Sequence, residues 1–160
     1  MLKIHMLSLA RPSTLLTLVA GLTFHSPAVH ARASKTQGEL GVFKVTDDPG
    51  GYVRDYAARV DKLRTEGRPV ALQGECDSAC TLYLTLPRRQ TCITQGAEFR
   101  FHAPSGQSEA VNRKIQDWMM RHYPRWVQSW IEQRAGRLNA QLVTMSFNDA
   151  RKFMRVCSNG

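Results

Sequence analysis

The sequence predicts one α/β domain, in which strand-like and helical stretches alternate before a group of helices near the C-terminus. Two further observations bound this prediction. At 160 residues the chain has the length of a single domain with its own hydrophobic core. It also contains four cysteines, an even number that favours two disulfides if the protein folds in an oxidising compartment.

The first 31 residues are expected to be a signal peptide rather than part of the fold. Lys3 and Arg11 give a positive start, residues 15–24 form an apolar run, and small residues around 29–33 provide a cleavage site. The apolar run is too short to span a bilayer. An uncleaved amphipathic anchor is the alternative. We therefore expect a periplasmic or secreted protein with no membrane span after signal removal.

The basic charge of the chain is moderate and scattered. Removing the signal peptide takes away two basic residues and no acid, which lowers the formal net charge from +9 to +7. The lysines and arginines form no run of five, and the aromatic residues do not interleave with them as stacking platforms would. This pattern favours a solvated basic surface over nucleic-acid binding. It also leaves open a structural protein that binds anionic envelope surfaces.

The mature chain is expected to begin with a flexible segment, residues 32–40, followed by the domain at 41–160. Apolar residues recur with helical spacing over about 52–65, and β-branched, strand-like stretches flank this helix at 41–45 and 69–73. Two strands joined by a helical crossover are parallel. The first half of the domain is therefore predicted to be a βαβ unit.

The second half is predicted to hold two short strands and four helices. A small-residue turn follows the second strand and opens a helix, and alternation of apolar and polar residues marks the later strands. The expected strands are 91–94 and 98–101, and the expected helices are about 79–86, 110–119, 125–134 and 147–156.

Ser78 and His102 are the candidate catalytic residues. Ser78 lies in the turn between a strand and a helix, where a serine can cap the helix or act as a nucleophile. His102 ends a strand and is the nearest sensible base, although a histidine there can simply bond to a backbone carbonyl. Gly50 and Gly51 follow the first strand, and glycine lets the backbone approach a substrate closely.

The cysteines are expected to form disulfides, for which three pairings exist. We predict Cys80–Cys92 and Cys76–Cys157, the second of which would tie the end of the chain to the central turn. A metal site built from Cys76, Cys80, Cys92 and a histidine is the alternative, but its spacing differs from the paired short motifs of zinc sites. No metal or other cofactor is therefore predicted.

These motifs resemble the Clp protease proteolytic subunit, of the crotonase-like superfamily, and more closely small exported Clp-protease-like proteins of bacteria. The similarity is good over residues 42–104 and looser over 105–157. It implies a spiral of βαβ units in a small single domain with C-terminal helices. It also implies a serine hydrolase or peptidase that acts on a peptide or small acyl substrate.

The resemblance assigns a role to each motif residue. In that family a Pro-Gly-Gly turn gives a backbone N–H to the oxyanion hole, which matches Gly51. The serine that opens the next helix is the nucleophile, which matches Ser78, and the following amide, here of Ala79, is the second oxyanion donor. The base stands in a His-x-Pro context, which matches His102, 24 residues after the serine.

The sequence departs from the family at the third member of the catalytic triad. The family has an aspartate shortly before a Ser-x-x-acid-Ala helix start, and here Leu142 occupies its place while Asp149 corresponds to the helix acid. Asn139 or Thr144 could orient the histidine instead. A catalytically inactive relative that binds a peptide or partner is therefore the alternative function. The helical segment is shorter than the family's, so a homo-oligomer is allowed but the family's ring is not implied.

Overall fold

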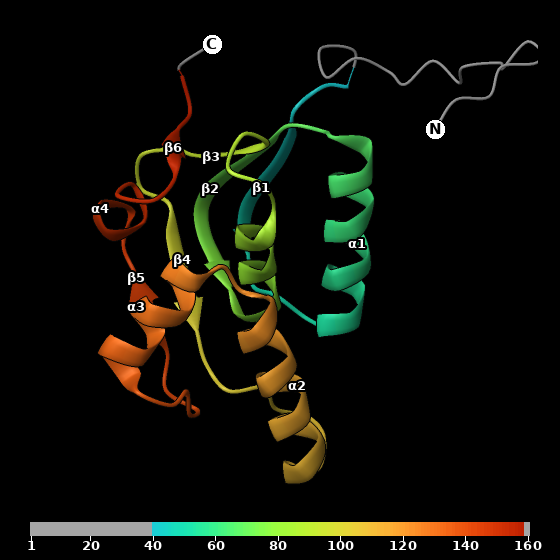
Figure 1. The fold of residues 1–160 in the computed structure, drawn as a ribbon, viewed down its shortest axis with the longest axis vertical. Coiled ribbons are helices and arrows are strands. Elements are labelled where there is room, and N and C mark those ends of the chain that lie inside the picture. Colours follow the sequence, from blue (N-terminus) through green and yellow to red (C-terminus); the bar gives the residue numbers. More distant parts are fainter. Residues whose placement is uncertain (1–39, 159–160) are drawn as a thin grey trace, which may run out of the picture. The chain divides into compact units, whose positions relative to one another are not determined.

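The structure is a computed structural model that describes residues 40–158 (Figure 1). The predicted signal peptide and all but the last residue of the predicted flexible segment, 32–40, lie outside the described residues. The described elements are, in chain order, β1 (Phe43–Asp48), α1 (Val53–Glu66), β2 (Val70–Asp77), the 3₁₀ helix η1 (Ser78–Thr85), β3 (Thr91–Ile93), β4 (Glu98–Phe101), α2 (Glu109–His122), α3 (Arg125–Ala135), β5 (Val143–Met145), α4 (Phe147–Ala150) and β6 (Arg155–Val156).

Strand β2 is the centre of a six-stranded mixed sheet. β1 pairs in parallel along one edge of β2, whereas β3 and β4 share the other edge, β3 beside its first half and β4 beside its second. β5 is antiparallel to β4, and β6 is parallel to β3. The predicted α/β class and the parallel βαβ unit are therefore confirmed. The shared edge of β2 brings the ends of β2 and β4 side by side.

Helix α1 forms where the apolar spacing predicts it. Tyr56, Val60 and Leu63 recur about once per turn, and their side chains are buried on the side of the helix that faces the sheet. The helix ends at Gly67, which takes the left-handed conformation with φ of 63° and donates its amide to the last turn. The Tyr56 ring meets the ring of Tyr83 edge-on at 5.9 Å, which joins α1 to η1.

The sequence-based prediction fails in three places. The helix expected at 79–86 is a 3₁₀ helix that begins one residue earlier, at Ser78. Strand β5 was not predicted, because three residues carry too little pattern to detect. The last helix, predicted over 147–156, ends at Ala150, and the chain then pairs as β6 with β3. Tertiary pairing overrides local helical preference at this end of the chain.

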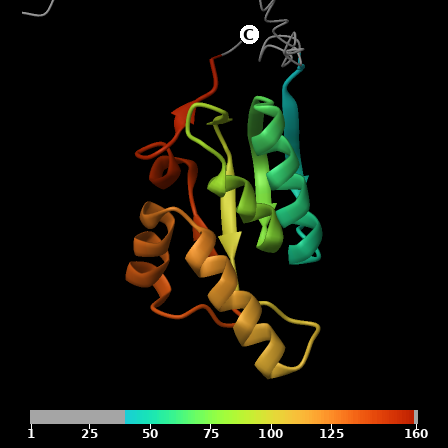
Figure 2. The same ribbon diagram turned by 45° about the vertical axis from the view of Figure 1, so that its right-hand side comes forward.

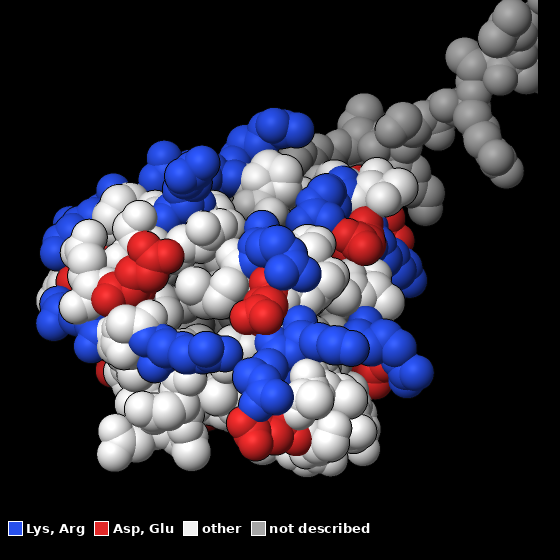
Figure 3. Space-filling view, turned by 60° about the horizontal axis from the view of Figure 1, so that its bottom comes forward, with Lys and Arg blue, Asp and Glu red and all other residues white. Residues whose placement is uncertain are grey.

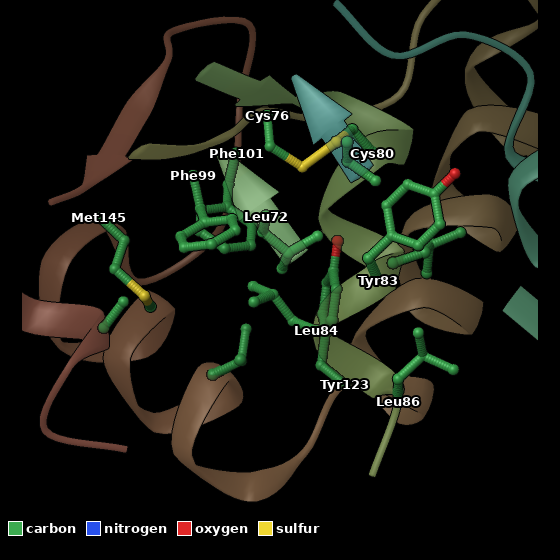
Figure 4. Packing of buried hydrophobic residues seen from close by; sticks show 14 of the residues in the cluster. Leu72, Cys76, Cys80, Tyr83, Leu84, Leu86, Phe99, Phe101, Tyr123 and Met145 are labelled. Atoms are coloured by element: carbon green, nitrogen blue, oxygen red, sulfur yellow. A yellow bond between two sulfur atoms is a disulfide. The ribbon is translucent and has the colours of Figure 1, made fainter. Parts of the chain in front are cut away.

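Helices α2 and α3 follow β4, and α2 extends beyond the end of the sheet (Figure 2). The Ser108 side chain accepts a hydrogen bond from the Val111 amide and caps α2. Between the helices and the sheet lies one core, in which Leu72, Phe99, Phe101 and other apolar side chains converge beside a disulfide (Figure 4).

The predicted disulfide pairing is wrong: the bridges are Cys76–Cys80 and Cys92–Cys157. Cys76 ends up close to Cys80, with Cα atoms 5.3 Å apart, because the chain turns sharply between β2 and η1. Cys157 reaches Cys92 because the unpredicted strand β6 runs beside β3, and the Cys157 amide donates to the Ile93 carbonyl. All four thiols are therefore oxidised, which contradicts the alternative of a thiolate metal site.

Within residues 40–158, no helix is long and apolar enough to cross a membrane.

Candidate active site

Ser78 stands where β2 ends and η1 begins, with its backbone in an unusual conformation. Its φ is +53°, in the left-handed region that a serine rarely occupies. The helix cap is Asp77 rather than Ser78, and within residues 40–158 the Ser78 hydroxyl forms no hydrogen bond. The capping interpretation is therefore wrong. A serine held in a strained strand-to-helix turn is typical of exposed nucleophiles.

The Pro-Gly-Gly turn packs directly against Ser78. Gly50 has a φ of +82°, and a Cβ atom placed on it would lie 2.5 Å from the Asp77 carbonyl oxygen and 2.9 Å from the Ser78 Cβ. Only glycine allows both the conformation and this close approach. The turn is fixed by Asp48, whose carboxylate accepts hydrogen bonds from the Gly50 amide at 2.9 Å and from the Tyr56 hydroxyl.

The two glycine amides of this turn differ in their bonding. Gly50 donates to Asp48, whereas the Gly51 amide has no hydrogen-bond partner anywhere in the described part of the chain. An N–H that is exposed and unbonded can donate to a ligand. The Gly51 amide is therefore available to a ligand, whereas the Gly50 amide is not.

His102 follows the last residue of β4 and makes one hydrogen bond. Its Nδ1 lies 2.8 Å from the carbonyl oxygen of Ala103. A carbonyl oxygen only accepts, so this contact places the proton on Nδ1 and leaves Nε2 as a lone-pair acceptor. That is the tautomer a general base needs. The Ala103 amide donates to the Asn139 carbonyl at 2.7 Å, which holds the segment in place.

Among the residues that the structure describes, no carboxylate bonds to the His102 ring. Asp149 accepts from Lys152 at 3.1 Å and from the Ser146 hydroxyl at 3.3 Å, and the bond from Lys152 holds its pKa below the usual range. Asn139 contributes its backbone rather than its side chain, and Thr144 makes no hydrogen bond to the ring. Leu142, in the place of the family's aspartate, is 53% exposed.

Ser78 and His102 line the same cavity, although no hydrogen bond joins them. The whole cavity leaves about 10 Å³ for the centre of a water molecule, roughly what one water molecule needs. Helix α2 supplies one wall of this cavity through Gln116, Met119 and Met120. A carbonyl substrate would therefore require α2 or its side chains to move outward.

A bidentate ion pair holds the two strand ends together. Asp77 and Arg100 are register partners on β2 and β4, and the guanidinium binds both carboxylate oxygens, at 2.6 and 2.8 Å. Asp77 immediately precedes Ser78, and Arg100 lies two residues before His102. The pair therefore fixes the relative position of the two candidate catalytic residues.

A buried chain of hydrogen bonds connects the Ser78 carbonyl to the end of α2. The Thr81 hydroxyl donates to the Ser78 carbonyl at 2.5 Å, and the Tyr123 hydroxyl at the end of α2 lies 2.5 Å from Thr81. Burial raises the pKa of Tyr123, so its hydroxyl stays protonated and donates. This chain links the candidate nucleophile to α2.

A mutant of ClpP1 from Listeria monocytogenes aligns with a TM-score of 0.49 and 17% sequence identity, over 77% of this chain and 78% of that chain. No family model matches the sequence, and no curated protein does.

Ser78 and His102 were candidates from the sequence alone, whereas the residues that support them were not. Asp48 precedes the Pro-Gly-Gly turn, where an aspartate that bonds to the backbone two residues on is common, so its role was detectable. The Asp77–Arg100 pair depends on the β2–β4 register, and the Ala103 carbonyl carries no side-chain signal at all. Neither could be read from residue types alone.

No metal-binding arrangement is seen among the described residues, since no three His, Cys, Asp or Glu side chains cluster suitably. Basic side chains are distributed over the face in Figure 3, with acidic and uncharged residues between them. This face shows no single basic stripe.

Proposed function

We propose that this chain is an exported, Clp-protease-like serine hydrolase that acts on a peptide or small acyl substrate. Ser78 is the nucleophile, His102 the base, and the Gly51 and Ala79 amides are the oxyanion donors. The observation that carries the proposal is that Ser78, in its strained conformation, shares a cavity with a histidine whose Nε2 is free to accept a proton.

The reaction follows from these positions. The Ser78 Oγ forms a bond to the substrate carbonyl carbon while its proton passes to the His102 Nε2, and the two amides stabilise the oxygen that becomes negative. The imidazolium then gives the proton to the leaving amine or alkoxide as the carbonyl–heteroatom bond breaks. Water, activated by the same histidine, hydrolyses the acyl-enzyme.

We expect His102 to act without the carboxylate partner of a full triad. The Ala103 carbonyl fixes its tautomer as an aspartate would, but a neutral oxygen stabilises the imidazolium less than a carboxylate does. Loss of the acid in serine proteases costs about four orders of magnitude in rate. We therefore expect slow acylation, best seen with activated esters or fluorophosphonates.

The test is labelling of the mature protein with a fluorophosphonate probe, read out by mass spectrometry of the modified peptide. We expect modification at Ser78, its abolition in Ser78→Ala, and at least a tenfold slower reaction in His102→Ala. Ser105→Ala, which removes another hydroxyl near the site, is the matched control and should react normally. Equal labelling of the Ser78→Ala protein would show that the mechanism is wrong.

A catalytically silent relative is the second candidate, and the small size of the cavity favours it. Such a protein would bind a peptide or partner in the same cleft with no covalent chemistry. It predicts that Ser78 resists the probe at all concentrations, while the Ser78→Ala and unmodified proteins bind the same peptides equally well. Labelling at Ser78 contradicts it.

A further inference from the structure

The Cys76–Cys80 disulfide encloses Ser78 in a five-residue loop, in which Ser78 is the middle residue. Four extended residues would separate the two Cα atoms by about 13 Å, whereas the bridge holds them 5.3 Å apart. The chain must therefore reverse sharply between the end of β2 and the first turn of η1.

The chain reverses through the unusual backbone conformation of Ser78. Its φ of +53° is costly for any residue with a side chain, because Cβ then crowds the backbone. Two other contacts also restrain Ser78 but do not close the loop. Gly50 packs against the Ser78 Cβ, and the Thr81 hydroxyl donates to the Ser78 carbonyl. The disulfide is the one covalent constraint that spans Ser78 on both sides.

The bridge is not placed for thiol exchange. Cys76 is 2% exposed and Cys80 is fully buried, so a thiolate has no approach to either sulfur while the protein stays folded. Figure 4 shows the bridge beside the side chains of the core. A permanent structural role for this bridge fits its position better than a redox one.

The two disulfides differ in what they can do for stability. Cys92 and Cys157 are separated by 65 positions, whereas Cys76 and Cys80 are separated by four. A crosslink restricts the unfolded chain more when its loop is longer. The short loop thus contributes less to global stability, and its main effect falls on the residues that it contains.

We propose that the Cys76–Cys80 disulfide is a positioning element, which holds Ser78 in the left-handed conformation that presents its hydroxyl to the cavity. The catalytic consequence rests on the proposed function, whereas the conformational consequence does not.

The first experiment compares two variants that each lack one disulfide, Cys76→Ala/Cys80→Ala and Cys92→Ala/Cys157→Ala. The rate constant of fluorophosphonate labelling per folded molecule and the thermal midpoint are measured for both. Removal of the short bridge should slow labelling about a hundredfold, as expected for a misplaced nucleophile, with the smaller loss of thermal stability. Removal of the long bridge should leave the labelling rate nearly unchanged and cause the larger loss of thermal stability. Equal labelling of the two variants would overturn the proposal.

The second experiment does not depend on catalysis. Ser78→Gly is introduced into the unmodified protein and into Cys76→Ala/Cys80→Ala, and the change in thermal midpoint is compared. Glycine adopts positive φ freely, so Ser78→Gly should raise the midpoint where the disulfide imposes this conformation. Without the bridge Ser78 relaxes, and the same substitution should lower the midpoint. If Ser78→Gly raises the thermal midpoint in both backgrounds, or lowers it in both, the proposal is contradicted.

The two experiments distinguish a failure of the proposed function from a failure of the positioning role of the disulfide. If the unmodified protein is never labelled, the proposed function fails, while the sign change still tests the positioning role. Cys76→Val/Cys80→Ala keeps more of the buried volume and serves if the alanine variant does not fold. Failure of both variants to fold would overturn the proposal, since the bridge would then be required by the fold rather than by Ser78.

Discussion

The two halves of the candidate site are held very differently. Ser78 is fixed by a disulfide across its own turn, by the packing of Gly50 and by a hydrogen bond to its carbonyl. Within residues 40–158 the His102 ring has one hydrogen bond, to the carbonyl of its neighbour Ala103, and no carboxylate bonds to it. The candidate nucleophile is thus constrained from several directions, whereas the candidate base is constrained from one.

This difference shows where the chain departs from a full catalytic triad. The contacts that position Ser78 are present and tightly packed, so its strained conformation is maintained. The part that would strengthen the base is replaced by a backbone carbonyl. Substitutions on the serine side should therefore remove function, and substitutions on the histidine side can be sought that increase it.

The largest effect is expected from Gly50→Ala. Its φ of +82° disfavours a side chain by about 1–2 kcal/mol, and the new Cβ would collide with the backbone carbonyl oxygen of Asp77 and the side-chain Cβ of Ser78. We expect Ser78 labelling to fall about a hundredfold and the thermal midpoint to drop. Labelling kinetics and thermal melting measure the two effects.

Gly106→Ala is the matched control for that substitution. Gly106 has a similar φ of +87°, but nothing lies within 4 Å of a Cβ placed on it. Gly106→Ala should carry the cost of placing a side chain at positive φ but not the collision, so Ser78 labelling should stay normal. If both variants lose labelling equally, the contact between Gly50 and Ser78 is not what matters.

A smaller effect, in the opposite direction, is expected from Leu142→Asp. Leu142 precedes Val143, the register partner of Phe101, and His102 follows Phe101, so the two residues adjoin the same strand pair. A carboxylate there would stabilise the imidazolium and should increase labelling about tenfold, well short of the full effect of a buried triad aspartate because the position is exposed. Gln141→Asp adds the same charge one residue away and should leave the rate unchanged.

The smallest effect is expected from Asp149→Asn, which tests whether the remaining acid serves the histidine. The pKa of Asp149 is lowered in the folded protein, chiefly by Lys152, so its carboxylate stabilises the fold above its unfolded pKa. The substitution should cost about 0.5 kcal/mol at pH 7, and the difference should vanish as pH falls through the lowered pKa. Ser78 labelling should not change. A slower labelling rate would instead connect Asp149 to the base.

The sequence predicted the local features of the site better than its long-range ones. Gly50 and Ser78 lie in turns whose small residues point to special backbone conformations, and His102 ends a strand with clear alternation. The Cys92–Cys157 bridge and the Asp77–Arg100 pair depend on which strands become neighbours, which residue spacing does not encode. Strand β6 shows this best: its local pattern favours a helix, and its pairing with β3 decides otherwise. The Cys76–Cys80 bridge depends instead on the sharp turn between β2 and η1.

The Cys92–Cys157 bridge has a topological consequence. It closes a covalent ring that runs from β3 to the segment after β6 and includes His102, all of α2 and all of α3, but not Ser78. One peptide-bond cleavage on the exposed loop before α2 would open this ring without releasing a fragment. Helix α2 could then swing away from the cavity while both halves of the protein stay on one molecule until a reductant separates them.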